Sequence, residues 1–140
     1  MRHLVLLLLS LIAMNAPLAQ SVRTPEPGSQ ERKALLDATR APLEQRLRQP
    51  VLFTVDQLNV AGDWAFLRAH LQGAGGKPLD FAGTPFEEAA RAGFLSRTYV
   101  ALLQRQQGHW AIRAEAVGPT DVAWANWADN YGAPAALFDH

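Results

Sequence analysis

The sequence predicts an α+β fold in which one N-terminal helix packs on a curved, four-stranded antiparallel sheet made of two hairpins. A leucine stripe with helical spacing comes first, at Leu36, Leu43 and Leu47. Two pairs of β-branched and aromatic segments follow, and a glycine-containing turn joins the members of each pair. Helix-capping residues after each pair predict a short inserted helix and a short C-terminal helix.

The first 21 of the 140 residues have the features of a secretory signal peptide. A short basic start, Met1-Arg2-His3, precedes an apolar run over residues 4–14, which is too short to span a bilayer core of about 30 Å. Small residues follow this run, and they fit cleavage near Ala19 or Ser21. We therefore expect a protein of the periplasm, or one secreted outside the cell.

Composition excludes several classes of protein. The chain contains no cysteine, so it has no disulfide and lacks the residue to which a bacterial lipid anchor would be attached after the signal. The 13 basic side chains match 13 acidic ones, a balance too neutral for a nucleic-acid binder. We expect a soluble single domain over residues 30–140, with no membrane anchor after cleavage and a flexible leader over residues 22–29.

The first helix is expected to begin at Gln30, because Ser29 is a favoured N-cap residue. Pro42 interrupts the leucine stripe. Since a proline removes a backbone donor and crowds the preceding turn, it should kink the helix or split it. Pro50 ends the helical pattern.

Both faces of the central strands are apolar. In the second strand Trp64 and Phe66 alternate with alanine and leucine, and in the third strand Tyr99 alternates with valine and leucine. An antiparallel sheet with one solvated face would alternate apolar and polar residues more cleanly. We therefore assign the first helix to one face and the tryptophan-rich C-terminal segment to the other. The four strands are expected over residues 51–60, 64–71, 99–106 and 110–117.

The connection between the hairpins is expected to be a mobile, glycine-rich loop over residues 73–83, followed by a short helix. Thr84 is the expected N-cap of this helix, with Pro85 at the first helical position and Glu87 completing a capping box. Gly93 should end the helix.

The sequence offers little catalytic chemistry. Beyond the signal region the serines are Ser29 and Ser96, and neither lies in a Gly-x-Ser-x-Gly motif. His70, His109 and His140 lack the spacing of metal-binding pairs. We expect no covalent hydrolase, no metal and no cofactor.

The C-terminal segment holds the densest aromatic cluster. Trp124, Trp127 and Tyr131 follow at i, i+3 and i+7, which places them on one helical face, and Thr120 or Asp121 would cap that helix. The simplest interpretation is that this face covers the core. The functional interpretation is an exposed aromatic platform for a glycan, a peptide or a partner protein.

Polar side chains on two strands suggest a second candidate site. Arg68 and His70 share one face of the second strand, and Arg113 and Glu115 share one face of the fourth. If the curved sheet brings them together they could line a polar pocket, with Tyr99 nearby as a further acid–base group. Solvated strand ends would explain the same pattern.

Three short motifs resemble landmarks of small uncharacterised secreted proteins of Gram-negative bacteria. They are Trp64-Ala-Phe66, then Ala101-Leu-Leu103 followed by Gly108-x-Trp110, and Gly118-Pro-Thr-Asp121-Val-x-Trp124. The element order is similar to cystatin-like and nuclear-transport-factor-like domains, in which a curved sheet wraps a helix. The resemblance implies such a fold. Domains of this kind include dehydratases, isomerases, inhibitors and binding modules, but the Gln-x-Val-x-Gly inhibitory loop of cystatins is absent here.

We expect a non-catalytic binding or accessory module that engages a periplasmic protein or an envelope component through the sheet or the C-terminal aromatic segment. The alternative is a small pocket enzyme that uses His70, Tyr99 or an aspartate for acid–base chemistry. A third possibility is a homodimer formed through an open face of the sheet.

Overall fold

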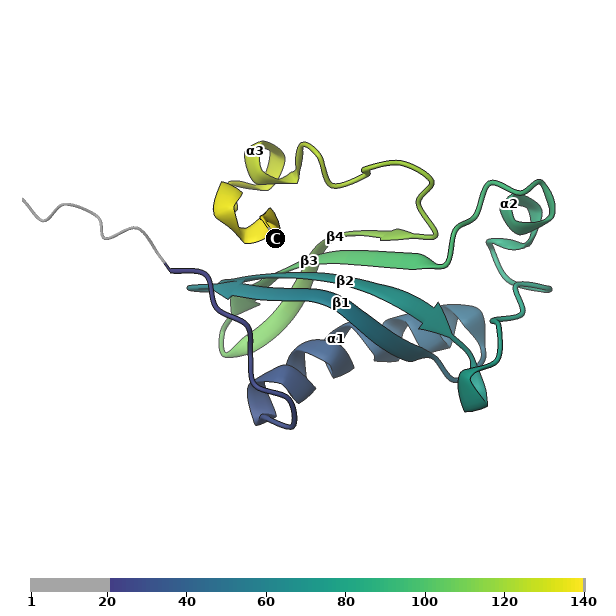
Figure 1. The fold of residues 1–140 in the computed structure, drawn as a ribbon, viewed down its shortest axis with the longest axis horizontal. Coiled ribbons are helices and arrows are strands. Elements are labelled where there is room, and N and C mark those ends of the chain that lie inside the picture. The colour runs from purple at the N-terminus through teal and green to yellow at the C-terminus, as the bar shows by residue number, and fades with distance from the viewer. Residues whose placement is uncertain (1–20, 140) are drawn as a thin grey trace, which may run out of the picture.

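The computed structural model describes residues 21–139 and has the predicted α+β architecture. α1 (Gln30–Leu47) packs on one face of a four-stranded antiparallel sheet, whose strands follow the order β1-β2-β3-β4. The C-terminal segment lies over the opposite face, and α2 lies beyond one end of the sheet (Figure 1). The strands are β1 (Leu52–Ala61), β2 (Trp64–Gln72), β3 (Thr98–Gln106) and β4 (His109–Val117). The short helical elements are η1 (Ala74–Gly76), α2 (Glu87–Arg91), α3 (Trp127–Tyr131) and η2 (Ala135–Phe138).

α1 begins as predicted. The Ser29 hydroxyl accepts a hydrogen bond from the amide of Arg32 at 3.2 Å. The helix continues through Pro42 without being split, and it ends at Arg48, whose φ of 53° is left-handed. Its buried stripe is Leu35, Thr39, Leu43 and Leu47, one residue for each turn of helix.

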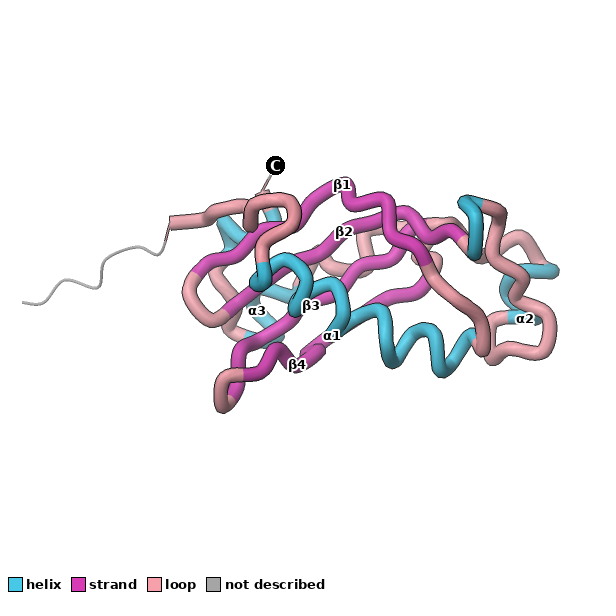
Figure 2. Tube along the Cα trace, turned by 90° about the horizontal axis from the view of Figure 1, so that it is seen from below, coloured by secondary structure: helices cyan, strands magenta, loops and turns pink. Residues whose placement is uncertain are grey.

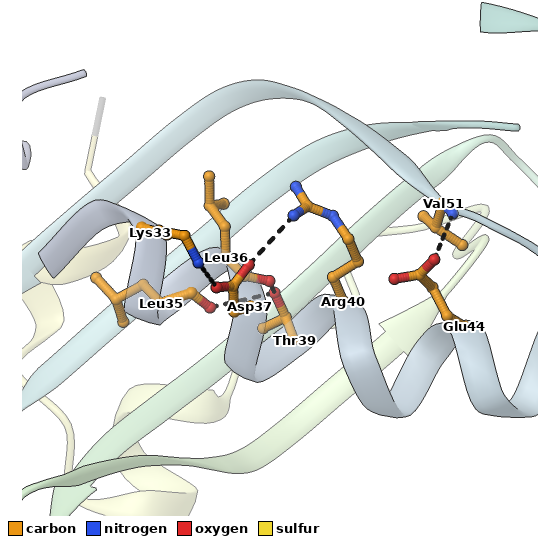
Figure 3. Close-up of polar contacts among 8 residues, drawn as sticks. All are labelled: Lys33, Leu35, Leu36, Asp37, Thr39, Arg40, Glu44 and Val51. Atoms are coloured by element: carbon orange, nitrogen blue, oxygen red, sulfur yellow. Dashed lines mark hydrogen bonds and ion pairs between the residues drawn. The ribbon is translucent and has the colours of Figure 1, made fainter. Parts of the chain in front are cut away.

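Three charged side chains on the exposed side of α1 pair with one another (Figure 3). Asp37 accepts from Lys33 at 2.5 Å and pairs with Arg40 at 3.3 Å, and the hydrogen bond from Lys33 lowers the pKa of Asp37. The buried Thr39 hydroxyl donates to the carbonyl of Leu36 at 2.9 Å. Near the other end of α1, Glu44 accepts from the amide of Val51 at 3.3 Å, so the helix also holds the entry to β1.

The two hairpins have the predicted turns. Gln107 and Gly108 between β3 and β4 have φ values of 52° and 79°, the two positive values that a type I′ turn requires. Gly62, with a φ of 58°, occupies the first turn position between β1 and β2.

Each edge strand contains a bulge that the sequence analysis did not predict. The register of β1 shifts between Val55 and Gln57. The register of β4 shifts between Ile112 and Ala114, which pair with Leu103 and Leu102. Because a bulge inserts one residue, the alternation of faces is interrupted at that point. Arg113 is the inserted residue of β4, so Arg113 and Glu115 lie on opposite faces. The prediction that they share a face is wrong.

One hydrophobic core lies on each side of the sheet, as the apolar character of both strand faces predicts. On the α1 side, leucines of the helix pack on Leu67 and Leu103. On the other side, Phe66 and Leu102 pack against Trp127 and Leu137 from the C-terminal segment. Figure 2, seen from the α1 side, shows the helix lying across the strands.

Segments at the two ends of the described chain are attached to β1. Backbone hydrogen bonds of 2.8 and 2.9 Å join Arg23 to Val60, so the segment expected to be a flexible leader lies along the sheet edge. Near the C-terminus, the side-chain amide of Gln57 donates to the carbonyl of Asp139 at 2.7 Å, and that of Asn59 donates to the carbonyl of Leu137 at 2.9 Å.

The N-termini of the two short helices differ from prediction. α2 begins at Glu87, and Thr84 instead forms a preceding turn in which its hydroxyl accepts from the amide of Phe86 at 3.2 Å. Glu87 pairs with Arg91 at 2.8 Å and does not complete a capping box. α3 begins only at Trp127, so Thr120 and Asp121 do not cap it. These helices are only five residues long, and tertiary contacts outweigh capping preferences in setting their limits.

The predicted ends of both short helices agree with the structure. Gly132 follows α3 with a φ of 73°, and Gly93 follows α2 with a φ of 74°. Among residues 21–139, no helix has the length and apolar character needed to cross a membrane.

Candidate functional site

The aromatic side chains of the C-terminal segment face the sheet. Trp127 is only 8% exposed and meets Phe66 in a T-shaped arrangement, with ring centroids 6.4 Å apart. Trp124 lies 6.0 Å from the same ring, and Phe138 lies 4.8 Å from it. Trp127 is therefore a core residue. An exposed platform made of Trp124, Trp127 and Tyr131 together does not exist in this structure.

A different aromatic cluster is accessible. The Arg113 guanidinium lies 5.8 Å from the ring centroid of Trp64 and 5.9 Å from that of Tyr131, and it also donates to the side-chain oxygen of Gln104. Arg113 is exposed, and the other three side chains are half-buried. We call Trp64, Gln104, Arg113 and Tyr131 the aromatic–arginine surface.

Four elements position this surface. Trp64 begins β2, and Gln104 lies directly opposite it on β3. Tyr131 ends α3, and Arg113 is the bulge residue of β4. The bulge turns Arg113 toward the face covered by the C-terminal segment. Within residues 21–139 no carboxylate forms an ion pair with Arg113, so its charge is available to a ligand.

His70 has a carboxylate partner but no enclosed site. Its Nε2 atom lies 3.2 Å from Asp56, which is the bulge residue of β1. The His70 side chain is 54% exposed. Arg68 lies two residues away on the same strand, with a buried Nε atom that has no hydrogen-bond partner among the described residues. The pairing of His70 with Asp56 depends on the bulge, which no residue pattern indicated.

Tyr99 lies on the opposite face of the sheet from His70. It is fully buried, stacks on Phe53 with centroids 5.4 Å apart, and donates to Glu115 at 2.6 Å. Glu115 in turn pairs with Arg46 of α1 at 2.6 Å. Burial, and then the hydrogen bond to Glu115, raise the pKa of Tyr99 above its ordinary value of 10.0. A neutral, inaccessible phenol connects α1 to the sheet but does not suit acid–base catalysis near neutral pH.

A cavity that no residue pattern predicted lies at the loop-rich end of the sheet. It has a volume of about 220 Å³ and lies between the end of β2, the loop before α2, α2 itself and the segment before β3. Its lining includes Leu71, Leu79, Phe81, Ala90, Leu95 and Arg97. The only signal was the presence of Leu79 and Phe81 in a loop otherwise rich in glycine.

The predicted site residues therefore divide into three groups. Arg113 and Tyr131 come together at the aromatic–arginine surface, Arg68 and His70 lie elsewhere on the same face, and Tyr99, Trp127 and the half-buried Trp124 pack in the two cores. Comparison of the chain with known protein families, with curated proteins and with solved structures finds no match.

Proposed function

We propose that this chain is an exported, non-catalytic binding module that engages an anionic glycan of the cell envelope through the aromatic–arginine surface. The observation that carries this proposal is the position of Arg113 between two partly exposed aromatic rings, with no acidic partner in the described part of the chain. Aromatic rings and arginine are also the residue types that contribute most to binding at protein surfaces.

The chemistry of these side chains favours a charged saccharide. The apolar C–H face of a sugar ring stacks on Trp or Tyr, and a planar guanidinium binds a carboxylate or phosphate through two parallel hydrogen bonds. Gln104 accepts from Arg113 and fixes the orientation of the guanidinium. Because strands and a helix hold the surface, little conformational entropy is lost when a ligand binds.

The N-terminal sequence supports export to the periplasm or outside the cell. The basic start and short apolar run are typical of a cleaved signal, although residues 1–20 lie outside the described structure. The proposal places the chain among small secreted proteins of Gram-negative bacteria with a cystatin-like element order. The intact mass of the exported protein tests it: we expect an N-terminus at Gln20 or Val22, and a chain that retains Met1 would contradict export by cleavage.

Co-sedimentation with purified peptidoglycan sacculi and with lipopolysaccharide tests ligand binding. Sacculi carry carboxylates, whereas lipopolysaccharide carries phosphates as well as carboxylates, so binding to sacculi would identify a carboxylate ligand and binding to lipopolysaccharide alone would favour a phosphate. We expect Arg113→Ala to weaken binding to the preferred probe by about tenfold, since hydrogen bonds to charged groups contribute about 1.5–3 kcal/mol.

Arg105→Ala is the matched control for this experiment. The Arg105 guanidinium also lies over a tryptophan, 4.6 Å from the ring of Trp110, but Trp110 packs on the α1 side of the sheet. This variant should bind as the unmodified protein does. Absence of binding to both probes, or equal losses in the two variants, would contradict the proposal.

A further inference from the structure

The cavity at the loop-rich end of the sheet has walls that are held in place. On one side, the carbonyl of Arg97 accepts from the amide of Leu71 at 2.7 Å, and the Ser96 hydroxyl donates to the carbonyl of Pro119 at 2.5 Å. Gly118 packs so closely against Leu95 that a Cβ atom there would lie 2.4 Å from it. These contacts fix the segment that carries Leu95 and Arg97.

The opposite wall is the loop that precedes α2, and it too is attached. The side-chain amide of Gln49, just after α1, donates to the carbonyl of Asp80 at 2.5 Å and accepts from its amide at 3.2 Å. Phe81 meets Phe86 edge-on, with centroids 6.4 Å apart. The loop expected to be mobile is therefore hydrogen-bonded to the segment just after α1 through both backbone groups of Asp80, and the cavity is formed before any ligand enters.

The cavity is lined mainly by apolar residues, but polar atoms make up nearly half of its surface, and Arg97 is the one charged residue among the described residues that line it. Leucine, phenylalanine, alanine and proline side chains supply the apolar part of the wall. The Ser96 hydroxyl is already used, because it donates to Pro119 and accepts from the amide of Thr98. The Arg97 guanidinium forms no ion pair with any carboxylate of residues 21–139. Arg97 beside the apolar side chains of the cavity complements an anion with an apolar body.

The volume indicates the size of the group that fits inside. A protein cavity of about 150 Å³ accommodates one benzene molecule. About 220 Å³ therefore accommodates one ring with a short substituent. We infer that this cavity binds a small apolar monocarboxylate, with the ring or branched chain inside and the carboxylate against Arg97. This site is separate from the aromatic–arginine surface and does not depend on its function.

Titration of the protein, purified after expression of the full chain, with phenylacetate tests this inference. 2-Phenylethanol is the neutral control, since it has the same ring and a similar length. The methyl signals of Leu71 and Leu95 report on the cavity by nuclear magnetic resonance. We expect both signals to shift saturably, and phenylacetate to bind about ten times more tightly than the alcohol.

Three variants distinguish the contribution of the Arg97 charge to binding from the contribution of the shape of the cavity. Arg97→Gln should bring the affinities for phenylacetate and 2-phenylethanol together, because the cation is lost. Ala90→Leu should abolish binding of both compounds by filling the cavity. Arg91→Gln is the control, since Arg91 lies on α2 next to Ala90, is 79% exposed and does not line the cavity.

The comparison of phenylacetate with 2-phenylethanol uses the unmodified protein alone, so it does not depend on whether any variant folds. Equal affinities for the anion and the alcohol would overturn the inference, as would the absence of any saturable shift at Leu71 and Leu95. An Arg97→Gln variant that folds and still prefers phenylacetate would also overturn it.

Discussion

The Tyr99 hydroxyl is a single buried polar group that connects three elements, because its partner Glu115 also pairs with Arg46 of α1. Tyr99→Phe keeps the ring that stacks on Phe53 but leaves one oxygen of Glu115 without its donor. We expect a loss of about 1–3 kcal/mol in the free energy of unfolding, measured by urea denaturation at neutral pH. An unchanged free energy would mean that water replaces the hydroxyl.

The raised pKa of Tyr99 also predicts a loss of stability in alkali. Its pKa in the unfolded chain is near 10, and burial raises it in the folded protein, so the unfolded chain releases this proton first. The stabilisation is complete below pH 10 and declines as pH rises above it, by up to about 1.4 kcal/mol per pH unit. The Tyr99→Phe variant has no hydroxyl proton to release at this position. Its free energy of unfolding should therefore decline less steeply above pH 10. Parallel curves for the two proteins would contradict this explanation.

Gly118 and Gly132 both have left-handed φ values, of 64° and 73°, but their surroundings differ. A Cβ atom on Gly118 would lie 2.4 Å from Leu95 and 2.8 Å from the carbonyl oxygen of Ser96, whereas one on Gly132 would meet nothing within 4 Å. Gly132→Ala should cost about 1–2 kcal/mol for the backbone conformation alone. Gly118→Ala should cost about 1–3 kcal/mol more because of the clash. Thermal unfolding of the two variants measures the difference.

At the scale of elements, the Gln49 side chain connects the loop before α2 to the end of α1. Gln49→Ala removes both hydrogen bonds to the backbone of Asp80. We expect faster hydrogen exchange at the Asp80 amide, with the amides of β2 and β3 unchanged, because the loop opens locally while the sheet remains folded. Gln49→Glu is the matched control, since it keeps an acceptor and loses the donor, and its effect should be intermediate. Exchange that rises equally in the sheet would indicate global destabilisation instead.

The elements that the sequence predicted well are those that local chemistry determines. Ser29 caps α1 and Gln107-Gly108 turns the second hairpin because one side chain or two φ values decide the structure there. The bulges at Asp56 and Arg113 could not be predicted, since strand register depends on long-range pairing. The unpredicted bulge in β4 also explains why the prediction that Arg113 and Glu115 share one face was wrong.

For the molecule as a whole, the C-terminal segment acts as a third layer. The sequence predicted this coverage because Phe66 and Leu102 are apolar on the face that α1 does not reach. Trp127 contributes most of its surface to that layer, being 8% exposed. Trp127→Ala should reduce the free energy of unfolding by about 3–5 kcal/mol, measured by denaturant unfolding. A loss below about 1 kcal/mol would contradict a core role for this residue.

The candidate sites were less predictable than the fold. The sequence selected Arg113 and Tyr131, but their proximity depends on the β4 bulge and on where α3 begins. It did not select Trp64 or Gln104, because both looked like ordinary strand residues. The cavity beside Arg97 was missed for a similar reason: its walls come from four separate segments that only the folded chain brings together.

We expect Trp127 and Leu137 of the C-terminal segment to stabilise the fold, while Tyr131 of that segment and Arg113 of β4 bind a ligand beside this core. The most direct test is co-sedimentation of Tyr131→Ala with the envelope glycan that the unmodified protein prefers, alongside its thermal unfolding. We predict about tenfold weaker binding, with a change in Tm of only a few degrees. Unchanged binding by this folded variant would contradict the claim.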